Sequence, residues 1–204
     1  MPDLKPILES LIFVSDAPLS LDRMSGLLEE SDRGDIRAAL MELTADYRQR
    51  GGAIFLAEVA GGYQFRTRPE YADYLKRLTK TKAPKFSQSA LETLAIVAYR
   101  QPMTRAEIEY LRGVDCGGVL KTCMEKRLIR ILGKKDVPGK PLIYGTTKEF
   151  LELFSLKDLA SLPTLKEIQD LGDNSFEDGQ QELPLGGEEL VDERTGSSQA
   201  STSD

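Results

Sequence analysis

The sequence predicts an α+β fold that is mostly helical, uses one small module twice and ends in an acidic tail. Apolar residues recur at helical spacing in two blocks of about 80 residues, and in each block two short strand-like segments follow the third helical stretch. From Thr164 to Asp204 the chain has eleven acidic residues against two basic ones. This polar segment has too little apolar surface to offset the entropy of folding. Residues 164–204 are therefore expected to be largely disordered.

The first block is expected over residues 1–83. Helices are predicted over 4–14, from a cap at Ser20 through Leu28, and from Ser31 or Asp32 to about Gly51. The third helix has an apolar stripe made of Ile36, Ala39, Leu40, Leu43 and Tyr47. Residues 54–59 and 63–67 then alternate like strands around a glycine turn, and a further helix begins at Pro69.

The second block, over residues 84–163, has the same order. Predicted capping boxes at 89–92 and 104–107 begin two helices, and a third helix is expected over 117–126. Strands follow over 129–132 and 142–145, and residues 146–149 are expected to cap a last helix through Phe154. Three helices followed by a hairpin is the winged-helix arrangement, so the sequence predicts two tandem winged-helix domains joined by a linker near residues 80–85.

Composition excludes several classes of chemistry. The chain has no histidine and only two cysteines, Cys116 and Cys123, which removes histidine-based catalysis and the usual zinc sites. No cofactor, no metal and no enzymatic activity are therefore expected. No apolar run approaches the roughly 20 residues that cross a bilayer, and the N-terminus lacks signal-peptide character. A cytoplasmic protein without a membrane partner is expected.

Winged helices often bind DNA, so a DNA-binding regulator is the alternative function. The third helix of the first block has the carboxylates of Asp35, Glu42 and Asp46 on its outward face, and phosphates would repel them. The second hairpin loop has a basic cluster made of Lys134, Lys135 and Lys140. This cluster could contact phosphates, or it could be part of an ordinary solvated loop. With a net charge of −6, only weak and non-specific DNA binding is expected.

An apolar surplus indicates a different kind of partner. In the helix that begins near Ser89, the expected core stripe is Leu91, Leu94, Ala95 and Ala98, which leaves Ile96, Val97 and Tyr99 partly outside it. Phe13, Val14 and Met41 similarly lie outside the apolar stripes of their own helices. These residues are either buried all round beneath neighbouring elements or covered by another polypeptide.

Several segments resemble segregation and condensation protein B, an accessory subunit of the bacterial SMC–kleisin complex. The resemblance is dense from Ser87-Gln-Ser-Ala-Leu-Glu to Tyr110-Leu-Arg-Gly-Val114, and in Pro138-Gly-Lys-Pro-Leu-Ile-Tyr-Gly-Thr-Thr146 and Leu156-Lys-Asp-Leu-Ala-Ser-Leu-Pro163. It is looser over 4–80, where Leu11 to Ser20 matches best. Cys116-Gly-Gly118 and Cys123 depart from the small serine-like and leucine residues expected there, and both changes are conservative in size or polarity.

The resemblance implies two winged helices, a homodimer formed chiefly by the first module, and binding of the kleisin (ScpA-like) subunit chiefly by the second. The kleisin would connect the chain to the SMC ATPase, in complexes associated with the nucleoid. By position, the residues expected to bind kleisin are Ile96, Tyr99, Pro102, Met103, Tyr110 and Tyr144. Those expected at the dimer interface are Leu4, Leu8, Leu11 and Met41.

Overall fold

The computed structural model describes residues 3–79, 86–164 and 167. It contains helices and two small sheets, with helices in the majority, which confirms the predicted α+β class. Two separate hydrophobic cores are present, one built from residues 8–56 and the other from residues 90–150. We call residues 3–79 the N-terminal module and residues 86–164 the C-terminal module. The predicted boundary at residues 83–84 and nearly all of the predicted disordered tail lie outside the described residues.

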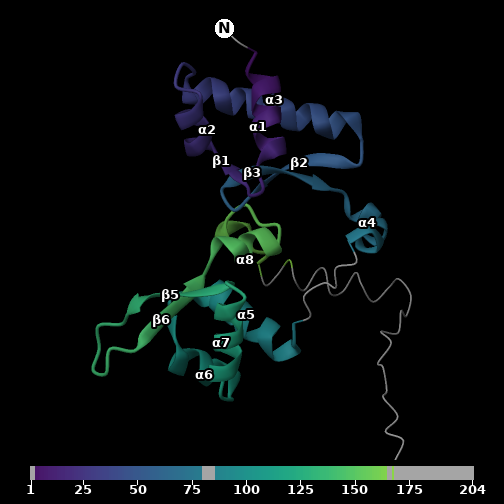
Figure 1. Ribbon diagram of the computed structural model, residues 1–204. Coiled ribbons are helices and arrows are strands. Elements are labelled where there is room, and N and C mark those ends of the chain that lie inside the picture. The colour runs from purple at the N-terminus through teal and green to yellow at the C-terminus, as the bar shows by residue number, and fades with distance from the viewer. Residues whose placement is uncertain (1–2, 80–85, 165–166, 168–204) are drawn as a thin grey trace, which may run out of the picture. The chain divides into compact units, whose positions relative to one another are not determined.

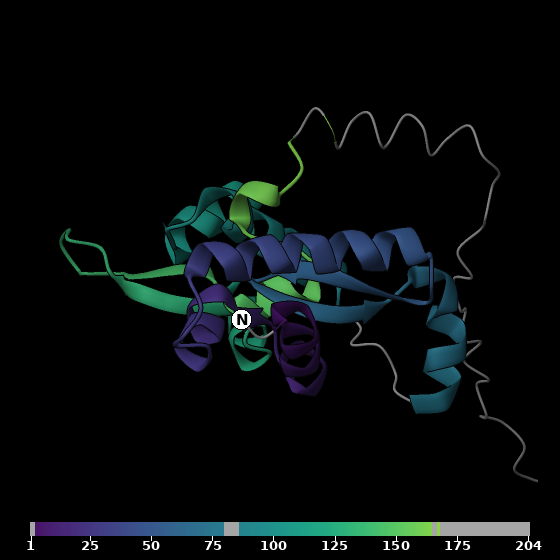
Figure 2. The ribbon, with the colours of Figure 1, turned by 90° about the horizontal axis from the view of Figure 1, so that it is seen from above.

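Three helices build the core of the N-terminal module. They are α1 (Leu4–Val14), α2 (Leu21–Leu27) and α3 (Arg33–Arg50). Ser20 accepts a hydrogen bond from the amide of Arg23, so it caps α2 as predicted. The long helix α3 packs against α1, α2 and β2 (Figures 1 and 2). Four residues of its predicted stripe are buried, because they share the face that covers α1 and the sheet: Ile36, Ala39, Leu40 and Leu43. The fifth, Tyr47, is only partly buried against this core.

The sheet of the N-terminal module has the order β1-β3-β2. The predicted hairpin consists of β2 (Ile54–Val59) and β3 (Gly62–Thr67), with Ile54 opposite Thr67. The strand β1 (Leu19–Ser20) was not predicted; it has only two residues and pairs with the start of β3. A 3₁₀ turn at Pro69–Tyr71 then leads into α4 (Ala72–Thr79).

The C-terminal module repeats this order. Its helices are α5 (Gln88–Arg100), α6 (Arg105–Arg112), α7 (Gly117–Glu125) and α8 (Lys148–Leu153), followed by a 3₁₀ turn at Leu159–Ser161. The sheet has the order β4-β6-β5, with β4 at Met103–Thr104, β5 at Ile129–Lys134 and β6 at Leu142–Thr146. A register shift between Ile131 and Gly133 interrupts the hairpin, which extends away from α5, α6 and α7 (Figure 2).

Local predictions in this module were partly wrong. The capping box at Thr104 and Glu107 is confirmed. In α5, however, the cap is Ser87 rather than Ser89, and in α8 it is Thr147 rather than Thr146. Thr146 is part of β6, where the side chain of Gln101 accepts from its amide at 2.7 Å. Ser or Thr residues one or two positions apart can each cap a helix, so tertiary packing decides which of them does.

The core face of α5 was also predicted wrongly. Its buried residues are Ala90, Thr93, Leu94, Val97 and Ala98, whereas Leu91 and Ala95 are exposed. Val97 was expected partly outside the stripe but is fully buried. The sequence does not show which face of α5 is buried, because apolar residues occur on all sides of this helix. Thr93 is tolerated in the core since its hydroxyl donates to the Ser89 carbonyl at 2.9 Å.

Candidate protein-binding surfaces

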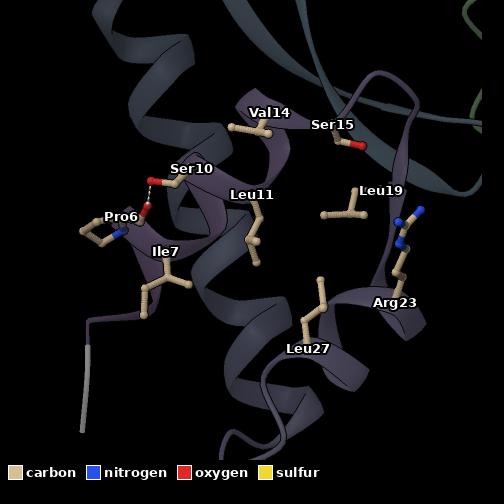
Figure 3. Close-up of a pocket in the computed structure, with 9 residues that line it drawn as sticks. All are labelled: Pro6, Ile7, Ser10, Leu11, Val14, Ser15, Leu19, Arg23 and Leu27. Carbon is tan, nitrogen blue, oxygen red and sulfur yellow. Dashed lines mark hydrogen bonds between the residues drawn. The ribbon is translucent and has the colours of Figure 1, made fainter.

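The N-terminal module has an apolar groove between α1 and α2. Its volume is about 650 Å³, and we call it the α1–α2 groove. Figure 3 shows Ile7, Leu11 and Val14 of α1 facing Leu19 of β1 and Leu27 of α2 across it. Pro6, Ser10, Ser15 and Arg23 complete the lining. A concave apolar surface of this kind can accept a few side chains from another polypeptide.

The polar groups around this groove are mostly satisfied locally. Ser10 donates its hydroxyl to the Pro6 carbonyl at 2.8 Å, and Ser15 donates to the Ala17 carbonyl at 2.7 Å (Figure 3 shows the first bond). Arg23 has no carboxylate partner among the described residues. The groove therefore offers apolar contact with one available cation at its rim.

The four residues predicted for the dimer interface are in different environments. Met41 is 67 % exposed on the outer side of α3, and Leu11 lines the α1–α2 groove. Leu4 is half-buried and packs against the core. Leu8 is fully buried, at 0 % exposure, in the core itself. Leu8 therefore supports the module from within and cannot contact a second chain directly.

The predicted kleisin-binding residues divide in the same way. Tyr110 is 86 % exposed on α6, and Tyr99 and Pro102 are also exposed. Ile96 is half-buried against the core. Met103 and Tyr144 are only 7 % and 8 % exposed, and they lie opposite each other where β4 pairs with β6. This pairing turns both side chains into the module, so they belong mainly to its core and offer a partner little surface.

The predicted phosphate-binding lysines do not act as one cluster. Lys135 donates to Glu107 at 2.5 Å, so its charge is already neutralised. Lys134 and Lys140 are exposed in the same hairpin. On the other module, Glu42 and Asp46 on the outer face of α3 are held by Lys5, whose nitrogen is 2.6 Å from the Asp46 carboxylate. The hairpin keeps only Lys134 and Lys140 without an ion pair among the described residues, and the outer face of α3 presents carboxylates, so neither surface has the extended basic character of a DNA-binding face.

The described residues include few side chains that could bind a metal ion or act as nucleophiles. Within residues 3–79 and 86–164, no group of histidine, cysteine, aspartate or glutamate residues could hold a metal ion. Cys116 and Cys123 are buried free thiols, and burial raises the pKa of each above its ordinary value. In the same ranges, no helix is long and apolar enough to span a membrane.

The α1–α2 groove was not predicted from the sequence. Leu19 and Leu27 come from different elements, and their approach to α1 depends on the short pairing of β1 with β3. The available signal was the excess of apolar residues on α1, which includes the exposed Phe13 and Val14. The sequence indicated that α1 had a second apolar face, but not which element would lie beside it.

Exposed apolar side chains and an apolar groove, without a cluster of reactive groups nearby, are typical of a protein that binds other polypeptides. The family model of the segregation and condensation complex subunit ScpB matches residues 6–165. A segregation and condensation protein B from Syntrophotalea carbinolica is 50 % identical over 169 residues, or 83 % of this chain and 85 % of that one. The chain belongs to the ScpB family.

Two solved structures are also similar. The crystal structure of ScpB from Mycobacterium tuberculosis is 33 % identical and covers 74 % of this chain and 94 % of its own, with a TM-score of 0.35. A crystallised ScpB N-terminal domain dimer, complexed with an ScpA peptide, is 36 % identical over 36 % of this chain and 91 % of its own, with a TM-score of 0.33. TM-scores this low do not support a common arrangement, so family membership rests on the sequence matches.

Proposed function

We propose that this chain is a non-catalytic subunit of an SMC–kleisin complex, where it binds the kleisin subunit and acts in chromosome condensation and segregation. The observation that carries the proposal is the extent of the family match, which spans residues 6–165 and therefore both modules. The exposed apolar side chains on each module are consistent with a protein that works by docking.

We further propose that each module is a winged helix. The hairpins β2–β3 and β5–β6 are the wings, and α3 and α7 occupy the position of the third helix. The carboxylates on α3 and the ion-paired Lys135 argue against a primary role in reading DNA. The modules would then serve as scaffolds for protein contact, with DNA binding at most weak and non-specific.

The exposed residues suggest a different role for each module. Met41, Leu11 and the α1–α2 groove belong to the module that would form a homodimer. Tyr99, Pro102 and Tyr110, with the half-buried Ile96, would contact the kleisin from the C-terminal module. Tyr110 is the best candidate anchor, since a large exposed tyrosine loses much accessible surface on docking and tyrosine is enriched among energetic hot spots.

Kleisin binding is tested with the Tyr110→Asp variant of the full chain. If Tyr110 is an anchor, titration with purified kleisin subunit should show a loss of more than about 2 kcal/mol in binding free energy. Tyr74→Asp is the matched control, because Tyr74 is 70 % exposed on α4 of the other module. Wild-type protein that does not bind the kleisin subunit would refute the proposed function, whereas unchanged binding by Tyr110→Asp alone would refute only the assignment of this residue.

A further inference from the structure

A second groove lies on the C-terminal module, between the end of α7, the first residues of β5, the end of β6 and α8. We call it the α7–α8 groove, and its volume is about 660 Å³. Its apolar lining comes from Met124, Ile129, Leu151 and Leu159. Its charged lining consists of Arg127, Arg130, Lys148 and Glu149. Three cations and one carboxylate thus surround an apolar surface on a chain whose net charge is −6.

The three cations of this groove lack ion pairs, unlike several other cations of the C-terminal module. Elsewhere in the C-terminal module, Arg105 pairs with Glu109, Arg112 with Glu92, and Lys135 with Glu107. Arg127, Arg130 and Lys148 are exposed and form no ion pair with any described residue. Their charges therefore remain available to a ligand, and their position around an apolar surface makes its rim electropositive.

The backbone fixes Arg127 at the rim in an unusual conformation. Its φ angle is +58°, in the left-handed region that favours glycine. Its amide donates to the Met124 carbonyl at 2.9 Å, and its own carbonyl accepts from the Thr147 hydroxyl at 2.5 Å. Glycine at this position would remove the guanidinium and also relieve the backbone, so binding can be tested there without endangering the fold.

We propose that the α7–α8 groove binds an acidic peptide segment that also contains apolar side chains. Carboxylates of the peptide would contact Arg127, Arg130 and Lys148, and its apolar side chains would cover Met124, Leu151 and Leu159, whereas Ile129 is buried in the core. Guanidinium groups suit such a ligand, since they form paired hydrogen bonds to carboxylates. A nucleic-acid backbone fits less well, because phosphates gain nothing from the apolar lining.

This site goes beyond the proposed function. None of its residues belongs to the surfaces assigned above to the dimer or the kleisin, so either proposal can fail without the other. The chemistry it selects is a peptide that combines apolar side chains with carboxylates, and the carboxylates are essential.

The test measures fluorescence anisotropy of a labelled peptide of alternating glutamate and leucine, added to the full chain. A variant combining Arg127→Gly, Arg130→Gln and Lys148→Gln should weaken binding at least about tenfold, and the dependence on salt should become shallower. Leu159→Ala should weaken it severalfold through the apolar lining. The matched control combines Lys121→Gln, Lys134→Gln and Lys140→Gln, which gives the same net charge outside the groove and should leave the affinity unchanged.

Several results would overturn the proposal. One is a peptide that does not bind, or that binds the groove variant as tightly as the wild type. Equal weakening by the control variant would show attraction to overall charge and no site. A second labelled peptide, with glutamine for glutamate, should bind at least tenfold more weakly, and equal affinity for it would exclude recognition of carboxylates. Displacement by a duplex oligonucleotide at lower concentration than by unlabelled peptide would identify a nucleic-acid site instead.

Discussion

The carboxylate of Glu107 links two elements of the C-terminal module. One oxygen accepts from the amide of Thr104 at 2.7 Å and from its hydroxyl at 2.9 Å, which completes the capping box of α6. The other accepts from Lys135 of the β5–β6 hairpin at 2.5 Å. The hydrogen bond from Lys135, followed by those from Thr104, lowers the pKa of Glu107 from 4.5 to about 2.

This shift predicts a loss of stability in acid. Because the pKa is lower in the folded protein, Glu107 contributes stability that is fully present above about pH 4.5 and is lost as the pH falls through about 2. Carbon-detected NMR of the carboxyl group should give a pKa near 2. In the Lys135→Gln variant the group should titrate at higher pH, because the largest cause of the shift is gone. A pKa of 4.5 in the wild type would contradict these contacts.

At the scale of elements, the pairing of β1 with β3 depends on close backbone approach. A Cβ atom at Gly62 would lie 2.8 Å from the Pro18 carbonyl carbon and 2.9 Å from that of Leu19. Both neighbours are backbone atoms and cannot turn away as a side chain can. Gly62 therefore permits the two-residue strand that also brings Leu19 to the α1–α2 groove.

Gly62→Ala should destabilise the protein by about 1–3 kcal/mol through this overpacking. The matched control is Gly26→Ala near the end of α2, where a Cβ meets no atom within 4 Å. Alanine there should be neutral or stabilising by up to about 1 kcal/mol, because it favours the helix. Urea unfolding measures both variants. If Gly62→Ala proves as harmless as Gly26→Ala, the close approach of β1 is incorrect.

Element boundaries were predictable where one residue type dominates the choice. Thr104 and Glu107 are spaced for a capping box, and no neighbouring residue competes with them. Ser87 and Ser89, by contrast, are equally good caps in isolation, as are Thr146 and Thr147. Their roles follow from strand pairing and helix packing, which no local pattern contains.

At the scale of the whole molecule, the question is which apolar residues remain available to partners. Met41 and Leu8 were both assigned to the dimer interface, yet Met41 is exposed and Leu8 is buried in the core. The two residues therefore separate an effect on association from an effect on folding.

Met41→Glu should shift the sedimenting species from near twice 22.6 kDa to near 22.6 kDa, while thermal stability of the fold changes little, since the site is on the surface. Leu8→Ala should instead cost about 2–5 kcal/mol of folding stability, as expected for a large-to-small change in a core. Analytical ultracentrifugation and thermal unfolding distinguish the two. A Met41→Glu protein that still dimerises would place the dimer contact elsewhere in the module.

The sequence by itself determined the order of the helices and hairpins, because the change from helical to alternating apolar period marks each element. It also determined the absence of histidine chemistry and the excess of apolar residues on α1 and α5. Only the tertiary structure decided which of these residues are exposed. Met103 and Tyr144 are buried because β4 pairs with β6, while Arg127, Arg130 and Lys148 meet at one groove because α7, β5 and α8 converge there. Such proximity depends on residues distant in sequence, and periodicity carries no information about it.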